Sequence, residues 1–472
     1  MNRPLPPLPF PGRLIMIGFG SIGQATLPLL LRHFTLTPQR ITVIAAHDHA
    51  SALACQHGVT FTQRVVTREN YRAVLAPLLE AGDLLLNLSV NVASLALIEL
   101  CHERGALYLD ASIEPWAGGY TDPAKSLSQR SNYALREAVL AFRRSHPAGP
   151  TAVVTQGANP GLVSAFVKQA LLNLAHDNGL NTECVTEQAH WAILAEQLGI
   201  RAIHIAECDT QLATPRKRRD EFVNTWSVAG FIAEALQPVE LGWGTHERHW
   251  PVDAARHGFG CDAAIYLKRP GAATRVHSWT PLEGPYLGML ISHGESISIA
   301  DHLTRREHGA LVYRPTVHYA YHPCDDALLS LHELAGKNWQ AQTQQRILRD
   351  ELTEGVDELG VLLMGNAKGV YWFGSRLTIA QARRLAPHNT ATSLQVVAGV
   401  LGGIRWALAH PNAGVVEPDD LDHYQVLEIA APYLGELVGV YGDWTPLQGR
   451  GALFNEELDH NDPWQFVNVR ES

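Results

Sequence analysis

The chain has 472 residues, of which 46% are hydrophobic and 18% are charged. This length allows two or three domains with sizeable cores, and the composition is typical of a compact globular protein, not of a disordered or fibrous one. The 47 acidic and 37 basic residues give a formal charge of −10, which argues against nucleic acid as a partner and favours small cations. The basic run at 216–219 is predicted to be a solvated loop.

The cysteines and histidines do not indicate a metal site. Six cysteines are scattered without a C-x-x-C pair, so neither disulfides nor a zinc knuckle is expected. His246 and His249 have the wrong spacing for a helical zinc motif, and His318 and His322 lie in a segment with strand character. The proline-rich start does not resemble a signal peptide, and no apolar run has membrane-spanning length. We therefore expect a cytoplasmic protein with no metal and no membrane partner.

An apolar strand near the N-terminus runs into the motif Gly18-x-Gly20-x-x-Gly23, and a helical pattern follows. In this context the glycines are typical of a dinucleotide-binding turn. The first allows the tight turn, the second lets a pyrophosphate approach the backbone, and the third lets helix and strand pack closely. Ser21 and Ile22 lie at the helix N-terminus, which would face the phosphates. The alternative is a Rossmann-type domain that binds no cofactor.

The second strand, ITVIAAHD, carries the information about the ribose. The acidic residue that usually ends this strand is missing, and Asp48 appears only later. Asp48 could still bind the ribose 2′-hydroxyl, which favours NAD, whereas the neighbouring His47 leaves room for the 2′-phosphate of NADP. We favour NAD.

Residues 1–155 alternate strand and helix patterns, which predicts an α/β fold with a Rossmann-type doubly wound parallel sheet. Predicted strands at 84–90 and 106–112 place Asn87, Ser89 and Asp110 at the carboxyl edge of this sheet, where ligands bind. We expect these three side chains to contact the cofactor. Asn159 is then predicted to cap a helix, with Pro160 in its first turn.

Residues 156–380 show alternating strands with long loops, which predicts a second α+β domain with a mostly antiparallel sheet. In the predicted strand at 286–300, His293 and Glu295 share one otherwise apolar face, and Glu207 ends a similar row. A buried carboxylate requires a cationic partner, although Glu207 could instead mark a strand end that emerges into water. Residues 381–472 are predicted to be a helical segment that packs back on the first domain.

The segment 224–247 combines an aromatic side chain with carboxylates. On a helix, Trp226, Gly230 and Glu234 share a face, with the indole and the carboxylate about 12 Å apart along the axis and room between them at the glycine. An indole attracts a desolvated ammonium and a carboxylate pairs with one, so a linear diamine could be held at two points. The alternative is an amphipathic helix whose tryptophan belongs to the core.

With these residues in view, the chain resembles the bacterial homospermidine synthases, which are NAD-dependent members of the saccharopine dehydrogenase-like superfamily. The resemblance covers nearly the whole length and rests on the following motifs: GFGSIG, EPW, GANPG, IHIAECDTQ, NTWSVAGFIAEALQPVELGWGTHE, AAIYLKRPGA, ESISIAD, RPTVHYAYHP and DELGVLL. One departure from the family pattern is Gly294, which stands where the family has an Asn. A second is the missing acidic residue at the end of the second strand.

The resemblance implies a set of site residues and a reaction. Trp226 would face the cation and Glu114 would lie close to the nicotinamide, while the residues around the diamine would be Glu207, Glu234, Asn159, His293 and Glu295. The implied reaction joins two putrescines, or putrescine and spermidine, through hydride abstraction, imine formation and hydride return, and releases ammonia. A homodimer is also implied.

Two other functions compete with this reading. A saccharopine-type or carboxyspermidine-type dehydrogenase would use free reduced cofactor, and its carboxylate substrates would require Arg or Lys in the pocket. A non-catalytic protein that binds NAD or polyamines would need no hydride geometry. The candidate segments contain Trp, Glu, Asn and His, which favours the synthase.

Overall fold

The computed structural model describes residues 6–387 and 389–471. The first of its two main sheets has seven strands, all parallel. In spatial order they are β22 (Ala413–Val416), β6 (Gly149–Val153), β5 (Leu107–Asp110), β4 (Leu84–Asn87), β1 (Leu14–Ile17), β2 (Ile41–Ala45) and β3 (Thr60–Gln63). Several strands are short apolar runs buried on both faces, which is typical of a parallel sheet covered by helices.

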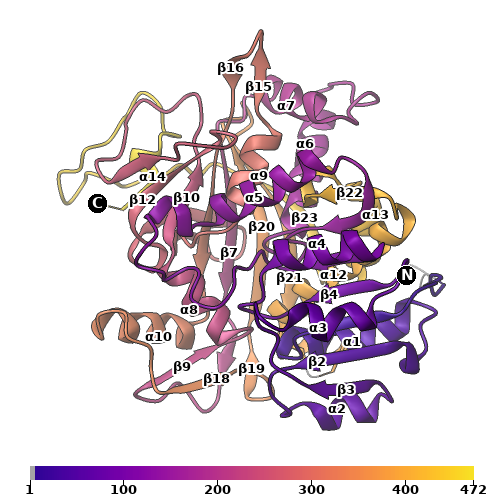
Figure 1. The fold of residues 1–472 in the computed structure, drawn as a ribbon. Helices are drawn as coiled ribbons and strands as arrows, with labels where there is room; N and C mark the ends of the chain where they lie inside the picture. The colour runs from indigo at the N-terminus through magenta and orange to yellow at the C-terminus, as the bar shows by residue number, and fades with distance from the viewer. Residues whose placement is uncertain (1–5, 388, 472) are drawn as a thin grey trace.

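Helices on both faces cover this sheet. They are α1 (Ser21–His33), α2 (Ser51–Gln56), α3 (Tyr71–Leu75), α4 (Ser94–Arg104) and α5 (Asn132–Ser145), with α12 (Ala391–Ala409) and α13 (His423–Ala430) from the C-terminal part. Figure 1 shows this layer at the lower right, in indigo and purple, with α12 and α13 in orange beside it. The predicted Rossmann-type fold is confirmed.

The second main sheet has ten strands and is mixed. Its path is β11 (Ala254–Arg256), β12 (Ala264–Pro270), β10 (Pro238–Gly242), β17 (Thr316–His322), β7 (Ala202–Asp209), β20 (Val356–Met364), β21 (Val370–Thr378) and β23 (Glu436–Gly442), with the hairpin β13 (Arg275–Thr280) and β14 (Gly284–Met289) attached to β17. Strands β17 and β7 are parallel, and the other pairs are antiparallel. The predicted mostly antiparallel second sheet is confirmed.

The remaining elements surround the second sheet. The helices are α6 (Leu162–Asp177), α7 (Gln188–Gln197), α8 (Val228–Leu236), α9 (Glu295–His302), α10 (Asp325–Gly336), α11 (Ile379–Leu385) and α14 (Phe466–Val469). Three two-stranded pairs complete the fold: β15 (Arg305–Glu307) with β16 (Ala310–Tyr313), β18 (Gln344–Ile347) with β9 (Glu221–Asn224), and β19 (Leu352–Glu354) with β8 (Leu212–Ala213).

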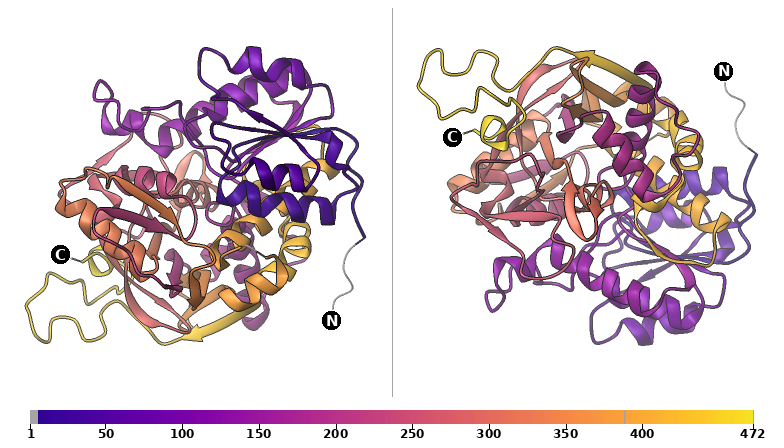
Figure 2. Two further views of the ribbon diagram at one scale, coloured as in Figure 1. Left: turned by 90° about the horizontal axis from the view of Figure 1, so that it is seen from below. Right: turned by 90° about the horizontal axis from the view of Figure 1, so that it is seen from above.

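The C-terminal part contributes to both sheets, whereas we expected a helical segment on the first domain. Strand β22 extends the first sheet beside β6, and β23 extends the second sheet beside β21. The stretch before α14 projects from the body on the side away from the N-terminus (Figure 2). The division into 1–155, 156–380 and 381–472 stays a prediction.

Helix α12 joins the two halves. It packs against α1, α13, β5 and β6 on one side and against β20 of the second sheet on the other. It is long and apolar enough to cross a membrane by length and composition, but 83% of its apolar window is buried inside the protein. Met16, Phe166, Leu359 and Leu401 belong to one continuous hydrophobic core that includes residues of both sheets. Burial therefore identifies α12 as a core helix.

The basic run at 216–219, expected as a solvated loop, is partly tied to α10. The Arg216 guanidinium donates to Asp326 at 3.0 Å, and Lys217, whose side chain is 8% exposed, pairs with Glu333. These contacts neutralise two of the four positive charges.

The close approach of α12 to the segment between β6 and α6 generates a stability prediction. A Cβ at Gly399 would lie 1.9 Å from the carbonyl oxygen of Gly157. We expect Gly399→Ala to destabilise the protein by about 1–3 kcal/mol, because the helix must move away from that backbone. Thermal unfolding measures the effect, with Gly336→Ala as the control because a Cβ there meets nothing within 4 Å. Equal melting temperatures for the two variants would contradict the packing argument.

Candidate active site

A cavity of about 1050 Å³ lies between the carboxyl edge of the first sheet and the second domain. Its lining includes the turn after β1, the ends of β2 and β4, the segment before α6, the segment leading into α8, and residues of β7 and β17. Sites of this size hold extended ligands, and the crevice beyond the carboxyl ends of the strands is where doubly wound sheets bind them. The cavity therefore has room for a dinucleotide and a small substrate.

The glycine motif builds one end of this cavity. Gly18 has φ +89°, and a Cβ there would lie 2.5 Å from the carbonyl oxygen of Leu88. A Cβ at Gly23 would lie 2.7 Å from the carbonyl oxygen of Gly18, whereas one at Gly20 would meet nothing within 4 Å. Gly20 precedes α1 and carries no side-chain cap, so the first amides of the helix remain free for an anion. This cradle fits a pyrophosphate.

Most of the predicted cofactor contacts lie in the cavity lining or directly behind it. Gly18, Gly20, Ser21, Ile22, Asn87 and Ser89 line the cavity, and Gly23 lies just behind this lining. Asn87 Oδ1 accepts from the Ser89 hydroxyl at 2.6 Å, which fixes both side chains at the end of β4.

Asp110 and Asp48 do not line the cavity, contrary to the expectation. Asp110 is fully buried and accepts hydrogen bonds from the Tyr108 hydroxyl at 2.8 Å and from the Thr155 amide at 2.5 Å. Burial raises the Asp110 pKa to about 6. Asp48 is exposed beyond β2, between His47 and His49, which both line the cavity. Asp110 holds the backbone that borders the site, and the contact of Asp48 with the ribose stays a prediction.

Trp226 lies before α8 and not on it, so the expected helical face is wrong in detail. The helix begins at Val228, and the Ser227 hydroxyl caps it by accepting from the Gly230 amide at 3.0 Å. A Cβ at Gly230 would lie 3.1 Å from Trp226 Cζ3, so the glycine makes room for the indole. Trp226, Gly230 and Glu234 all line the cavity.

The predicted polar residues of the second domain form one hydrogen-bonded chain, which we call the polar row. Glu234 Oε2 lies 3.0 Å from His293 Nε2, and His293 Nδ1 lies 2.9 Å from Asn159 Oδ1 and 3.2 Å from Glu295 Oε1. Asn159 Nδ2 donates to Glu207 Oε2 at 3.0 Å. Four elements far apart in the sequence thus meet at one side of the cavity.

The local structure of these residues differs from the expectation. Strand β14 ends at Met289 and α9 begins at Glu295, so His293 lies in the connecting loop. Helix α6 begins at Leu162 after Gly161, so Asn159 does not cap this helix. The side-chain amide of Asn159 instead takes part in the polar row. The predicted strand alternation was wrong, yet a short loop leading into a helix brings His293 and Glu295 together equally well.

Gly294, the departure from the family pattern, is the residue before α9 and donates no cap. A Cβ there would meet nothing within 4 Å, so an Asn would fit without displacing any neighbour. The glycine costs the helix a side-chain cap and leaves the polar row intact.

The electrostatics of the polar row follow from burial and opposite charge. Burial opposes a charged His293, but the carboxylates of Glu295 and Glu234 outweigh it and raise the His293 pKa to about 10. Burial raises the Glu207 pKa to about 7, although hydrogen bonds from Tyr319 and Asn159 favour its charged form. At neutral pH the row therefore contains an imidazolium and a carboxyl group that titrates in that range.

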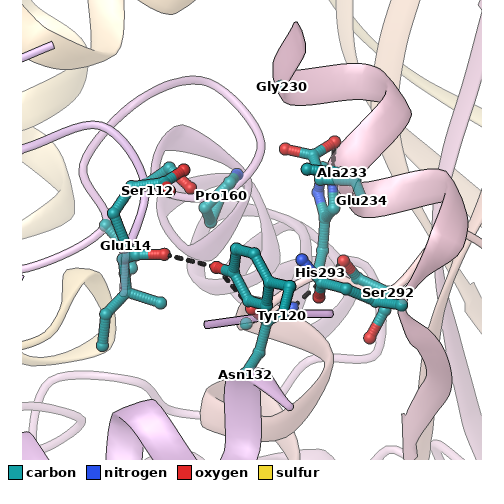
Figure 3. Close-up of a pocket in the computed structure, with 14 residues that line it drawn as sticks. Ser112, Glu114, Tyr120, Asn132, Pro160, Gly230, Ala233, Glu234, Ser292 and His293 are labelled. Atoms are coloured by element: carbon teal, nitrogen blue, oxygen red, sulfur yellow. Dashed lines mark hydrogen bonds and ion pairs between the residues drawn. The ribbon is translucent and has the colours of Figure 1, made fainter. Parts of the chain in front are cut away.

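Glu114 lies opposite the polar row, next to a smaller chamber. Figure 3 shows Glu114 on one side of this chamber and Glu234 with His293 on the other. The chamber has a volume of about 20 Å³, enough for one water molecule. Burial raises the Glu114 pKa to about 8, and the negative charge of Glu234 contributes in the same direction. A hydrogen bond from the Asn91 amide favours the charged form and opposes part of this rise.

Sequence reasoning missed Tyr319, whose hydroxyl donates to Glu207 Oε2 at 2.6 Å and whose ring lies 4.7 Å from that of His293. The available signal was the alternation of Tyr319 and Tyr321 in β17, but only the histidines of that strand were considered. In the described part of the chain, no group of three or more His, Cys, Asp or Glu could hold a metal ion.

The raised pKa of His293 predicts a pH effect on stability. Above pH 6.5 the folded protein keeps a proton on His293 that the unfolded chain loses. The contribution of this proton to the free energy of unfolding is therefore complete below pH 6.5 and is lost as the pH rises toward 10. The slope is at most about 1.4 kcal/mol per pH unit. Urea unfolding of the wild type and His293→Gln between pH 6 and 10 measures it. A stability difference that stays constant over this range would contradict the imidazolium.

Comparisons with known proteins agree with this architecture. Residues 14–153 match the family model of the saccharopine dehydrogenase NADP binding domain, and residues 157–443 match that of the saccharopine dehydrogenase C-terminal domain. A homospermidine synthase from Blastochloris viridis is 57% identical over 463 residues, which cover 97% of each chain. One from Mesorhizobium japonicum is 50% identical over 465 residues, covering 97% of this chain and 96% of the relative.

The comparison with solved structures leads to the same family. The crystal structure of a homospermidine synthase from Legionella pneumophila, in complex with NAD, has a TM-score of 0.93 at 50% sequence identity and covers 99% of each chain. Both the sequence and the arrangement of the two domains are therefore shared over the full length. The chain belongs to the homospermidine synthase family of saccharopine dehydrogenase-like enzymes.

Proposed function

We propose that the protein joins two putrescines to form homospermidine and release ammonia, or transfers the aminobutyl group of spermidine to putrescine and releases 1,3-diaminopropane in place of ammonia. The observation that carries this proposal is the polar row, which faces the same cavity as Trp226 and is continuous with the glycine cradle. A cationic diamine requires carboxylates and an aromatic face, and a hydride acceptor must lie beside it.

The cradle fits NAD, the dinucleotide bound to the relative from Legionella pneumophila. Bound NAD⁺ supplies a hydride acceptor and, once reduced, returns the same hydride, so the overall reaction has no net redox change. The residues that would hold it are Gly18, Gly20, Ser21, Ile22, Gly23, Asn87 and Ser89. Glu114 would lie close to the nicotinamide.

Glu207 and Glu114 handle protons in this proposal. An amine must lose its ammonium proton before it can lose hydride or attack a carbon, and a carboxylate with a pKa near neutrality can accept that proton and return it. Glu207 has a pKa of about 7 and Glu114 one of about 8, and both line the cavity. Glu207 takes the proton of the reacting amine, and Glu114 serves the side near the cofactor.

Glu234 holds the distal ammonium of the diamine. Its carboxylate reaches the cavity while His293 fixes its position at 3.0 Å, so a flexible substrate meets a rigid anchor. Trp226 stabilises the substrate cation that forms when hydride leaves, because its ring face attracts positive charge most strongly where water is excluded.

The rival dehydrogenase is less well supported. Besides the His293 imidazolium, whose charge Glu234 and Glu295 already pair, the cationic side chains among the described residues that line the cavity are Arg64, Arg68 and Arg349. The first two follow β3 at the dinucleotide end, and Arg349 donates to Gln24 of α1 at 3.0 Å. None of these three arginines belongs to the polar row. A substrate carboxylate would therefore lie beside the carboxylates of Glu207 and Glu234 with no free cation to pair with. The homodimer and the cytoplasmic location stay predictions.

The function is tested by incubating the purified protein with putrescine and catalytic NAD⁺. Homospermidine and ammonia should form in equal amounts without added reductant, as followed by mass spectrometry and an enzymatic ammonia assay. NADH that accumulates with turnover would indicate an ordinary dehydrogenase instead. Bound NAD without any product would indicate the non-catalytic binding protein.

The cation-stabilising role of Trp226 predicts a graded mutation series. Trp226→Ala should lower kcat on the order of 30-fold and Trp226→Phe only a few-fold, because a smaller ring retains part of the attraction. Steady-state assays with putrescine measure both variants. Trp250→Ala, a substitution of a half-exposed tryptophan, is the control and should change kcat little. Equal losses for the alanine and phenylalanine variants would contradict the role.

A further inference from the structure

A buried carboxylate that the proposed mechanism does not use lies directly behind the small chamber. Glu240 of β10 is fully buried and does not line either the cavity or the chamber. Its Oε2 accepts from the Asn132 amide at 2.8 Å and from the Ser292 hydroxyl at 3.1 Å, and its Oε1 accepts from the Tyr133 amide at 3.0 Å. Asn132 and Ser292 both line the chamber (Figure 3), and each donates a hydrogen bond to Glu240, which therefore lies one hydrogen bond away from the chamber.

A second set of contacts leads from Glu240 toward solvent. Glu240 Oε1 lies 3.6 Å from His257 Nε2, which is buried and has no hydrogen-bond partner. His257 Nδ1 lies 2.7 Å from the hydroxyl of Ser128, which is partly exposed. The His257 ring stacks on Tyr133 at 3.9 Å, so its position is fixed. A line of proton-carrying groups therefore runs from the chamber to the surface, and its one gap is the 3.6 Å between Glu240 and His257, which a small shift of either side chain would close to a hydrogen bond.

We propose that Ser292, Glu240, His257 and Ser128 form a relay that exchanges protons between the active site and solvent. The inference rests on the proposed function, because it requires amine protons that must leave the site and return. Glu240 and His257 touch neither substrate nor cofactor, so they act through the chamber.

Each step of the relay transfers one proton and no electrons. A proton taken up by Glu114, which lines the chamber, passes through the chamber to the Ser292 hydroxyl, which donates its own proton to Glu240 Oε2. The neutral Glu240 carboxyl group carries its proton on Oε1, and it gives this proton to His257 Nε2 as Oε2 receives the one from Ser292. His257 then gives its Nδ1 proton to Ser128, which releases it to solvent. The return of a proton follows the same groups in the opposite order.

The charge states of the two inner groups suit this exchange. Burial raises the Glu240 pKa to about 7 and lowers the His257 pKa to about 4. Near neutral pH, Glu240 can therefore gain or lose a proton, and a neutral His257 presents a free nitrogen to accept it. The other titratable groups facing this pair are the phenols of Tyr120, Tyr133 and Tyr266, and burial raises the pKa of Tyr120 and Tyr133 above the ordinary value.

The variant that tests the relay is His257→Phe, which keeps the stack on Tyr133 and removes both nitrogens. We expect kcat with putrescine to fall about tenfold, with an unchanged KM for putrescine. The solvent deuterium isotope effect on kcat should rise, and the isotope effect of putrescine deuterated at its amine-bearing carbons should fall, because proton exchange becomes rate-limiting. A merely structural role would move neither isotope effect, and unchanged isotope effects would overturn the relay.

Two further variants keep the test decisive. Ser128→Ala cuts the outer link at a partly exposed position and should shift both isotope effects in the same direction, even where His257→Phe does not fold. Ser126→Ala, an exposed serine two residues away with no contact to His257, should leave them unchanged. If the wild type forms no homospermidine, the proposed function has failed. If it forms product and both relay variants behave like Ser126→Ala, the relay alone has failed.

Discussion

The site depends on one ionic interaction, the imidazolium of His293 held between Glu234 and Glu295. Without a positive charge at this point, two carboxylates would share a buried space and one would have to be protonated. With it, Glu234 keeps a fixed position at the cavity wall, and Asn159 is oriented by His293 so that its amide donates to Glu207. One charge thus orders side chains from α8, α9, β7 and the segment before α6.

The two domains contribute different chemistry to one cavity. The first sheet provides backbone: glycines that leave space and helix amides that attract an anion. The second provides carboxylates and an indole that attract a cation. The reacting carbon of a diamine must lie where these two regions meet, and α12, which packs on both sheets, keeps that distance fixed.

Local sequence patterns predicted the fold and much of the site, whereas contacts between segments distant in sequence could not be predicted from them. The motif from Gly18 to Gly23 works through neighbouring residues, so its turn and cradle could be predicted. His293 and Glu295 were correctly paired, but a loop and a helix bring them together where a strand was expected. Asp110 turned inward to the Thr155 amide, and Tyr319 of β17 donates to Glu207 of the neighbouring strand β7. Such contacts depend on how strands 100 residues apart align, which periodicity does not encode.

The central claim is that the hydride taken from the substrate returns to the same carbon without leaving the protein. The most direct measurement uses putrescine deuterated at both amine-bearing carbons, with an excess of unlabelled NADH in solution, and mass spectrometry of the homospermidine formed. The account predicts that the product retains all the deuterium of its two putrescines. Loss of one deuterium per product molecule would show exchange with free cofactor and would contradict the account.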